Sequence, residues 1–192
     1  MLYVKNELGR CVARYRNIKM SQKFRVSFNS PQSGYMSIGL RAAGGREFVT
    51  AVAHKPYDSL RDLIVALGEL LEGYAQQQIV KWNCEPDELD FVLAAEGDVA
   101  RFNVVHYLNH RRSRRTSQEV FAVRGTKLEV CGAFWKALRE MHRDIEVDDF
   151  AGNWRREFPE AEMQQLTKAF RDYKHQAEAR EVKAEGTGTE IQ

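Results

Sequence analysis

Two groups of side chains in this sequence have the residue types of metal ligands. They are the histidines His106 and His110 and the acidic stretch at 144–148. We expect the histidines at the end of a strand, where a four-residue spacing does not hold both imidazoles on one helical face. A calcium-binding loop that began at the first of these acids would need glycine at its sixth position and glutamate at its twelfth. The chain has Asp149 and Arg155 there, so the sequence predicts no metal site.

The residues that could act as nucleophiles lack the partners that activate them. Cys11, Cys84 and Cys131 are widely spaced, odd in number and without a Cys-x-x-Cys pair, which favours reduced, buried thiols. No Gly-x-Ser-x-Gly motif occurs, and neither of the last two cysteines has an identifiable histidine partner. Gly44-Gly45 joins two predicted strands, so it is not a phosphate-binding loop. The sequence predicts a non-enzymatic protein without a cofactor; the alternative is an enzyme whose site assembles from residues distant in sequence.

Charge is segregated along the middle of the chain. If 96–98 forms a hairpin turn, strand pairing brings Asp90 near Val104 and Asp87 near Tyr107. The acidic block then lies beside a loop that is rich in arginine. The acidic block, which contains no basic residue, is Glu85, Asp87, Glu88, Asp90, Glu96 and Asp98. The arginines that follow it without an intervening acid are Arg101, Arg111, Arg112, Arg114 and Arg115.

Three interpretations of this charge pattern are open. The two blocks could neutralise each other within the fold, or they could form a surface that presents both signs to a protein partner. The arginines could instead anchor a nucleic-acid backbone, as an adaptor would. Only Tyr107 and Phe121 lie nearby for base stacking, and the net charge of +2 is small, so nucleic acid is the less favoured partner. The predicted partner-binding residues are Glu85, Asp87, Glu88, Asp90, Arg111, Arg112, Arg114 and Arg115.

Hydrophobic periodicity predicts an α+β domain with a mainly antiparallel sheet, helices packed on one face and a C-terminal helix. The first helix, 59–72, has a leucine stripe, a cap at Asp58 or Ser59 and Gly73 at its end; Gly68 inside it is expected to allow close approach to the sheet. A second helix runs over 126–143, and Pro159 begins a third. The predicted strands are 24–28, 36–40, 48–54, 79–83, 89–95, 99–108 and 118–124.

Composition supports one soluble domain in the cytoplasm. The 192 residues are 43% hydrophobic and 29% charged, as in globular proteins, and no apolar run approaches the roughly 18 residues of a membrane span. No signal peptide precedes the domain. Met20 opens the first clear strand, so residues 1–19 are either an extension from an upstream start or an N-terminal strand. The predicted divisions are 1–19 extension, 20–143 core, 144–157 connector, 158–180 C-terminal helix and 181–192 disordered tail.

The order of elements in the middle of the chain resembles a known class of protein. The leucine-rich helix at 59–73 is followed by a strand with Trp82, the Glu85-Pro86 step and a hairpin at 91–97. Residues 35–140 thereby resemble small bacterial immunity proteins that accompany polymorphic toxins. The resemblance implies a cytoplasmic protein without catalytic residues that binds and neutralises a toxin domain. Immunity proteins against nucleases are often acidic, and this slightly basic chain departs from that pattern, which argues against a nuclease as the partner.

Overall fold

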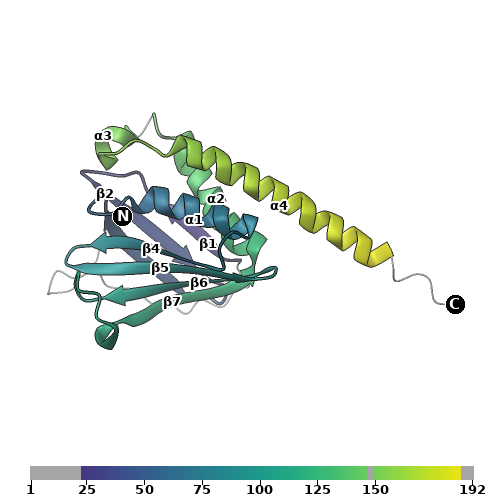
Figure 1. Ribbon diagram of the computed structural model, residues 1–192. Coiled ribbons are helices and arrows are strands. Elements are labelled where there is room, and N and C mark those ends of the chain that lie inside the picture. Colours follow the sequence, from purple (N-terminus) through teal and green to yellow (C-terminus); the bar gives the residue numbers. More distant parts are fainter. Residues whose placement is uncertain (1–22, 147–148, 187–192) are drawn as a thin grey trace.

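A computed structural model describes residues 23–146 and 149–186, and its strands form one seven-stranded antiparallel sheet in chain order (Figure 1). The predicted α+β class is therefore confirmed, and each predicted strand is present with small changes at its ends. The extension predicted for residues 1–19, with Cys11 in it, lies outside the described residues. The strands are β1 (Arg25–Phe28), β2 (Tyr35–Arg41), β3 (Glu47–Ala53), β4 (Gln77–Cys84), β5 (Asp87–Glu96), β6 (Val99–Tyr107) and β7 (Gln118–Thr126).

The sheet bends sharply between β3 and β4. These two strands pair at Ala53 and Asn83, whereas β4, β5 and β6 pair along most of their lengths. From that corner β3 crosses toward β7, and the rings of Phe48 and Phe121 lie 6.5 Å apart. The strands β1–β3 therefore pass behind β4–β7 in Figure 1, and the two parts enclose a concave face.

The helix α1 (Ser59–Glu72) has the predicted bounds and buries its leucine stripe against β4 and β5. It ends at Gly73, whose φ of 80° is readily adopted by glycine. Its N-cap residue is Asp58, one of the two predicted, but the Asp58 side chain makes no capping hydrogen bond, and the Ser59 hydroxyl donates to the carbonyl of Lys81. The expected close approach at Gly68 is wrong, because a Cβ there would meet nothing within 4 Å.

The helix α2 (Lys127–Arg143) packs on β1, β6 and β7 and has a reciprocal N-terminal cap. The backbone N–H of Glu129 donates to the Thr126 hydroxyl at 3.1 Å, and the Glu129 carboxylate accepts from the Thr126 N–H at 2.8 Å. Both groups satisfy donors that a helix start leaves unpaired. Phe134 then reaches the centre of the concave face, where its ring lies 4.9 Å from that of Phe102.

The C-terminal part of the chain is more ordered than its sequence indicated. The connector predicted for 144–157 contains the short helix α3 (Phe150–Trp154), and Phe150 and Trp154 are buried in the common core. The helix α4 (Glu160–Gly186) packs on α1 and α2 and continues past residue 180, where the predicted C-terminal helix ended. This segment is rich in alanine, glutamate and lysine, which are strong helix formers. No helix of the described residues is long and apolar enough to cross a membrane.

Replacing Leu67 by alanine should lower the free energy of unfolding by about 2 to 5 kcal/mol, the usual cost of a core cavity. Leu67 lies in the middle of α1 and has no exposed surface. Urea denaturation measures the change. Val65, on the same helix, is 36% exposed, so Val65→Ala is the matched control and should cost less than about 1 kcal/mol. Equal losses in the two variants would mean that the stripe does not face a packed core.

Candidate functional site

The hairpin of β5 and β6 sets the position of the acidic block, and it turns over two residues. The sequence prediction assumed a three-residue turn, so every cross-strand pair was placed one position away from its observed partner. A shift of one residue matters because alternate side chains of a strand point to opposite faces. The observed pairs are Asp90 with Val105 and Glu88 with Tyr107, in place of Asp90 with Val104 and Asp87 with Tyr107.

Glu88 and Asp90 lie on the outer face of the sheet, yet both are almost completely buried. They alternate with Leu89 and Phe91, whose side chains are in the core, so the two carboxylates point away from it. Their exposed fractions are only 3% and 8%. Buried carboxylates need a cation or several donors nearby, because removing a charge from water is costly.

Arg112 supplies that cation from the loop between β6 and β7. Its Nε lies 2.5 Å from Oε2 of Glu88 as an ion pair, without the alignment of a hydrogen bond. One terminal nitrogen donates to Asp90, and the other donates to the carbonyl of Leu89 at 3.5 Å. The backbone of Arg112 has a φ of 47°, which is uncommon for a residue with a side chain. The loop therefore adopts an unfavourable backbone conformation that turns this arginine inward.

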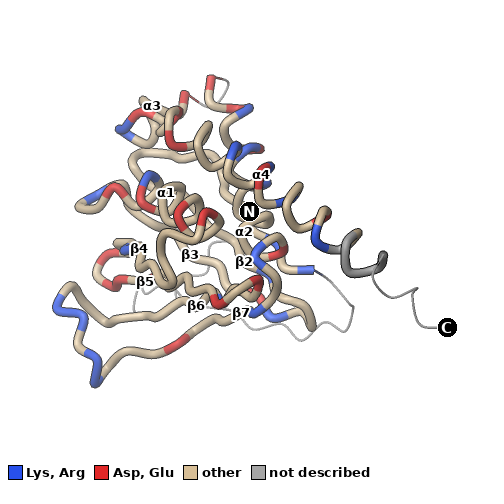
Figure 2. Tube along the Cα trace, turned by 45° about the vertical axis from the view of Figure 1, so that its right-hand side comes forward, with Lys and Arg blue, Asp and Glu red and all other residues tan. Residues whose placement is uncertain are grey.

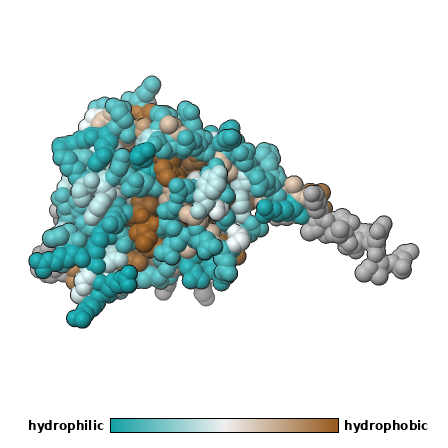
Figure 3. Space-filling view, viewed as in Figure 1, coloured by the Kyte–Doolittle hydropathy of each residue, from teal (hydrophilic) through white to brown (hydrophobic). Residues whose placement is uncertain are grey.

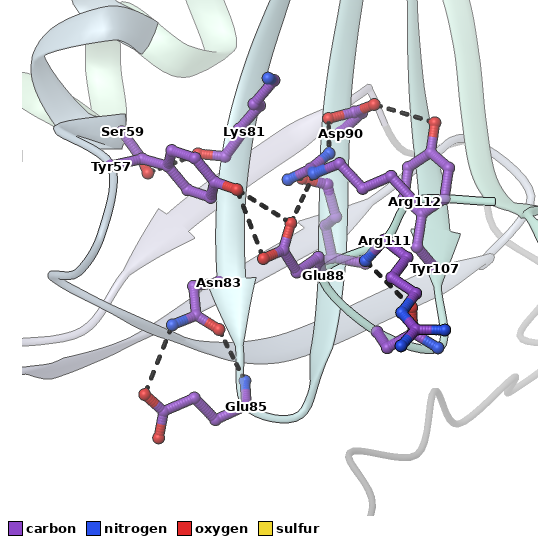
Figure 4. Close-up of polar contacts among 12 residues, drawn as sticks. Tyr57, Ser59, Lys81, Asn83, Glu85, Glu88, Asp90, Tyr107, Arg111 and Arg112 are labelled. Atoms are coloured by element: carbon purple, nitrogen blue, oxygen red, sulfur yellow. Dashed lines mark hydrogen bonds and ion pairs between the residues drawn. The ribbon is translucent and has the colours of Figure 1, made fainter.

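Two tyrosines enclose the guanidinium (Figure 4). Its central carbon lies 5.4 Å from the ring centre of Tyr57, in the loop before α1, and 5.3 Å from that of Tyr107 on β6. The Tyr57 hydroxyl donates to Glu88 at 3.2 Å, and the Tyr107 hydroxyl donates to Asp90 at 2.9 Å. The carboxylates thus receive charge and hydrogen bonds together, while the rings cover the cation.

The protonation states of this cluster follow from its contacts. Burial and the hydrogen bond to Asp90 raise the pKa of the Tyr107 hydroxyl, so it stays a donor near neutral pH. Burial of Arg112 opposes its charge, but Asp90, Tyr57 and Glu88 outweigh that effect and raise its pKa. The predicted neutralisation of the two charge blocks within the fold is therefore confirmed for Glu88, Asp90 and Arg112.

Asp87 lies on the other face of β5 and pairs with a histidine. Its Oδ2 is 2.9 Å from Nε2 of His106, and its exposed fraction is 4%. Its Oδ1 is buried without a hydrogen-bond partner. His110 is exposed in the loop beyond β6, so the two histidines are not brought together. In the parts of the chain that the structure describes, no three histidine, cysteine or acidic side chains are grouped as metal ligands.

The remaining predicted partner-binding residues are on the surface. Arg111, Arg114 and Arg115 are exposed, and no carboxylate of the described residues forms an ion pair with them. In Figure 4 the guanidinium of Arg111 lies away from Glu88 and Asp90. Glu85 is also exposed, and it accepts a hydrogen bond from the Tyr35 hydroxyl at 3.0 Å.

The arginine loop, which we define as residues 108–117, projects from one end of the sheet. Figure 2 shows its basic segments in blue beyond the ends of β6 and β7, and Figure 3 shows it as a hydrophilic projection at the lower left. Its sequence contains the short 3-10 turn Arg114–Thr116. One arginine of this loop is inside the fold and three are outside. The loop therefore presents three exposed arginines, while the fourth, Arg112, attaches it to the sheet through ion pairs with Glu88 and Asp90.

The structure narrows the predicted partner-binding set. Asp87, Glu88 and Asp90 are buried and Arg112 is partly buried, each against its own ion-pair partner, so the exposed members are Glu85, Arg111, Arg114 and Arg115. Sequence reasoning did not connect Tyr57 with this cluster, because it lies 31 positions from Glu88 along the chain. No local pattern distinguishes Arg112 from Arg111. The correct hairpin register alone would have placed Tyr107 opposite Glu88.

The two described cysteines are buried and form no disulfide. Burial raises the pKa of the Cys131 thiol to about 12, which keeps it protonated and unreactive near neutral pH. Cys84 lies at the end of β4, and its sulfur is 3.5 Å from the Thr50 hydroxyl. The Thr50 hydroxyl is not the basic group that would activate a cysteine nucleophile.

Comparison with known proteins identified no relative of this chain. No protein-family model, no curated protein and no solved structure matches the chain. The resemblance to immunity proteins therefore stays a prediction from the sequence.

Proposed function

We propose that this chain is a non-enzymatic binding protein whose arginine loop contacts an acidic surface of a partner protein. We further propose that it acts in the bacterial cytoplasm as an immunity protein and that the partner is the toxin it neutralises. The proposal rests on one observation, which is that the four arginines of the loop differ in their exposure and in their ion pairs. Arg112 is neutralised inside the fold, whereas Arg111, Arg114 and Arg115 are exposed and without ion pairs among the described residues.

An internal anchor makes these exposed charges effective in recognition. A flexible loop loses conformational entropy when it binds a partner. Ordering each of its side chains costs free energy and so lowers the binding affinity. Arg112 holds the middle of the loop against two carboxylates and two rings before any partner arrives. Exposed charges of one sign then speed association with a surface of the opposite sign and discriminate between partners.

A nucleic-acid adaptor remains the second candidate, because exposed arginines also bind phosphates. Binding to single strands generally adds stacking of bases on aromatic rings. The rings of Tyr57 and Tyr107 are instead covered by Arg112, and Phe121 is 1% exposed. Arg112 thus occupies one face of each tyrosine ring and Phe121 is buried, which favours the protein partner.

Changing Arg111, Arg114 and Arg115 together to serine should weaken binding to the toxin encoded by the adjacent gene by at least about tenfold, through loss of charge complementarity. Arg112 is left intact so that the fold is preserved. Titration calorimetry and survival of cells that express the toxin measure the effect. The matched control removes the same charge from α4 through Lys168→Ser, Arg171→Ser and Lys174→Ser, all at exposed positions, and should leave binding within about twofold.

The wild-type chain should also give no gel shift with duplex DNA or RNA at physiological salt. A complex of low-micromolar affinity that tolerates any sequence and weakens steeply with salt would support the adaptor, because such behaviour reflects counterion release. That result, together with unchanged toxin binding by the triple variant, would reject the proposed function.

A further inference from the structure

The arginine loop alone is too small for a stable protein interface. Such interfaces usually bury about 800 Å² on each partner, from about 20 to 30 residues. The loop spans only residues 108–117, so the partner of the proposed function has to contact a further surface. The outer face of β4–β7 is continuous with the loop, because Tyr107 ends β6 opposite Glu88 and Arg112 lies over its ring. This outer face is therefore the surface over which the interface would extend.

The centre of the outer face is apolar and accessible. Ile79 on β4 lies opposite Val92 on β5, and Val105 on β6 lies opposite Asp90, which is on this face. Ile79 is 51% exposed, and both valines are half-buried. The helices α1 and α2 pack on the other, concave face, where the alternating residues such as Phe91 are buried. Figure 3 accordingly shows hydrophobic surface in brown across the strands that Figure 1 labels β4, β5 and β6.

The end of the outer face away from the arginine loop is basic. Arg101 on β6 lies directly opposite Arg124 on β7, and both are exposed. Like charges in this position repel each other, and no carboxylate of the described residues forms an ion pair with either arginine. A hollow of about 670 Å³ lies beside them, and its charged lining residues are both arginines, Lys127 and Glu96. An acidic side chain in this hollow would reduce the repulsion between the arginines and gain charge complementarity.

We propose that the outer face of β4–β7 forms the larger part of the partner interface, and that the partner surface has apolar side chains between two acidic groups. The inference rests on the proposed function, since it extends the surface that begins at the arginine loop. One acidic group meets that loop, and the other enters the hollow at Arg101 and Arg124. Because β6 rises about 3.4 Å per residue, the two groups lie about 20 Å apart. A nucleic acid would match both basic ends with its phosphates but would leave the apolar centre without apolar contacts.

The first test is the variant Arg101→Ser with Arg124→Ser in the full chain. Titration calorimetry measures its binding to an inactive form of the toxin domain encoded by the adjacent gene. Affinity should fall at least about tenfold, because an acidic group of the toxin loses its counter-charges. The midpoint of thermal unfolding should stay the same or rise, since like charges no longer face each other. The control, Lys168→Ser with Arg171→Ser, removes the same charge from exposed positions of α4 and should leave affinity within about twofold.

The second test places a charge in the apolar centre. Ile79→Glu should weaken binding of the same toxin domain by about tenfold or more, because the complex would bury a carboxylate against apolar side chains. Val49→Glu is the matched control, since Val49 is also β-branched, lies on β3 and is 57% exposed. Because β3 passes behind β4–β7, this control should leave affinity within about twofold. Circular dichroism should show the wild-type fold in both variants.

The outcomes separate this inference from the function on which it rests. If the triple serine variant of the arginine loop loses affinity while either outer-face variant binds like the wild type, the inference fails and the proposed function stands. Equal losses in an outer-face variant and its control would also overturn the inference. If the wild type does not bind the toxin domain, both fail. Binding of duplex DNA that depends on Arg101 and Arg124 but not on Ile79 would replace the protein partner by a phosphate backbone.

Discussion

Replacing Arg112 by alanine should lower the free energy of unfolding by about 3 to 5 kcal/mol, the range for removing one partner of a buried ion pair. The variant leaves Glu88 and Asp90 buried with two tyrosine hydroxyls but without the guanidinium that forms ion pairs with both. It also removes the group between the rings of Tyr57 and Tyr107. Urea denaturation followed by circular dichroism measures the loss.

The neighbouring Arg111 is the matched control, because it has the same side chain in the same loop and is exposed. Arg111→Ala should change stability by less than about 0.5 kcal/mol. Lysine at position 112 should recover only part of the loss, since an ammonium cannot reach two carboxylates with a planar fork. A loss below about 1 kcal/mol for Arg112→Ala would contradict the buried anchor, since exposed ion pairs contribute that little.

A double-mutant cycle separates the ion pair from general packing. Glu88→Gln in the Arg112→Ala background removes one of the stranded charges, so the second substitution should cost less than it does alone. The two residues should thus show a coupling energy of about 0.5 to 3 kcal/mol. Simple additivity would indicate that Arg112 stabilises the loop by packing and not through Glu88.

Replacing Trp154 by alanine should have an effect of similar size, with a loss of about 3 to 5 kcal/mol from the cavity that remains. Trp154 ends α3 and is 2% exposed, and its ring meets that of His54 edge-on at 6.2 Å. Thermal unfolding should show the loss as a lower midpoint in a single transition, because α3 belongs to the common core.

Glu157→Ala, three residues along the same segment and exposed, is the control and should be within about 0.5 kcal/mol of the wild type. If both substitutions were neutral, the segment 149–157 would be a connector that contributes nothing to the core. A second transition in the Trp154 variant would instead show that the C-terminal helices unfold separately from the sheet.

The helices α1 and α2 could be predicted from the sequence almost to the residue. Each combines a wide apolar stripe with a local end signal, Gly73 for α1 and the Thr126–Glu129 pair for α2. The strands could be predicted because alternation along 36–40 and 48–54 reports one buried face. These signals are local, since the residues that produce them are close together in the chain.

The features that could not be predicted depend on distant contacts. Trp154 and Phe150 lie in an acidic stretch too short for periodicity, and only their packing against the rest of the core makes α3. The paired state of Arg112 depends on Tyr57 from another loop and on a hairpin register that differs by one residue. The sequence therefore left open whether the acidic block is paired within the fold or presented to a partner, and only the structure shows that its centre is buried.

Because Arg112 is held inside while Arg111, Arg114 and Arg115 are outside, the arginine loop separates the residue that maintains its shape from those that meet a partner. The outer positions can exchange charge, size or polarity with little consequence for folding, since exposed substitutions usually change stability by less than about 0.5 kcal/mol. A new target can then be acquired by replacing a few outer side chains. Such a change of partner would keep Arg112 and its two tyrosines unchanged, and it would replace the side chains at positions 111, 114 and 115.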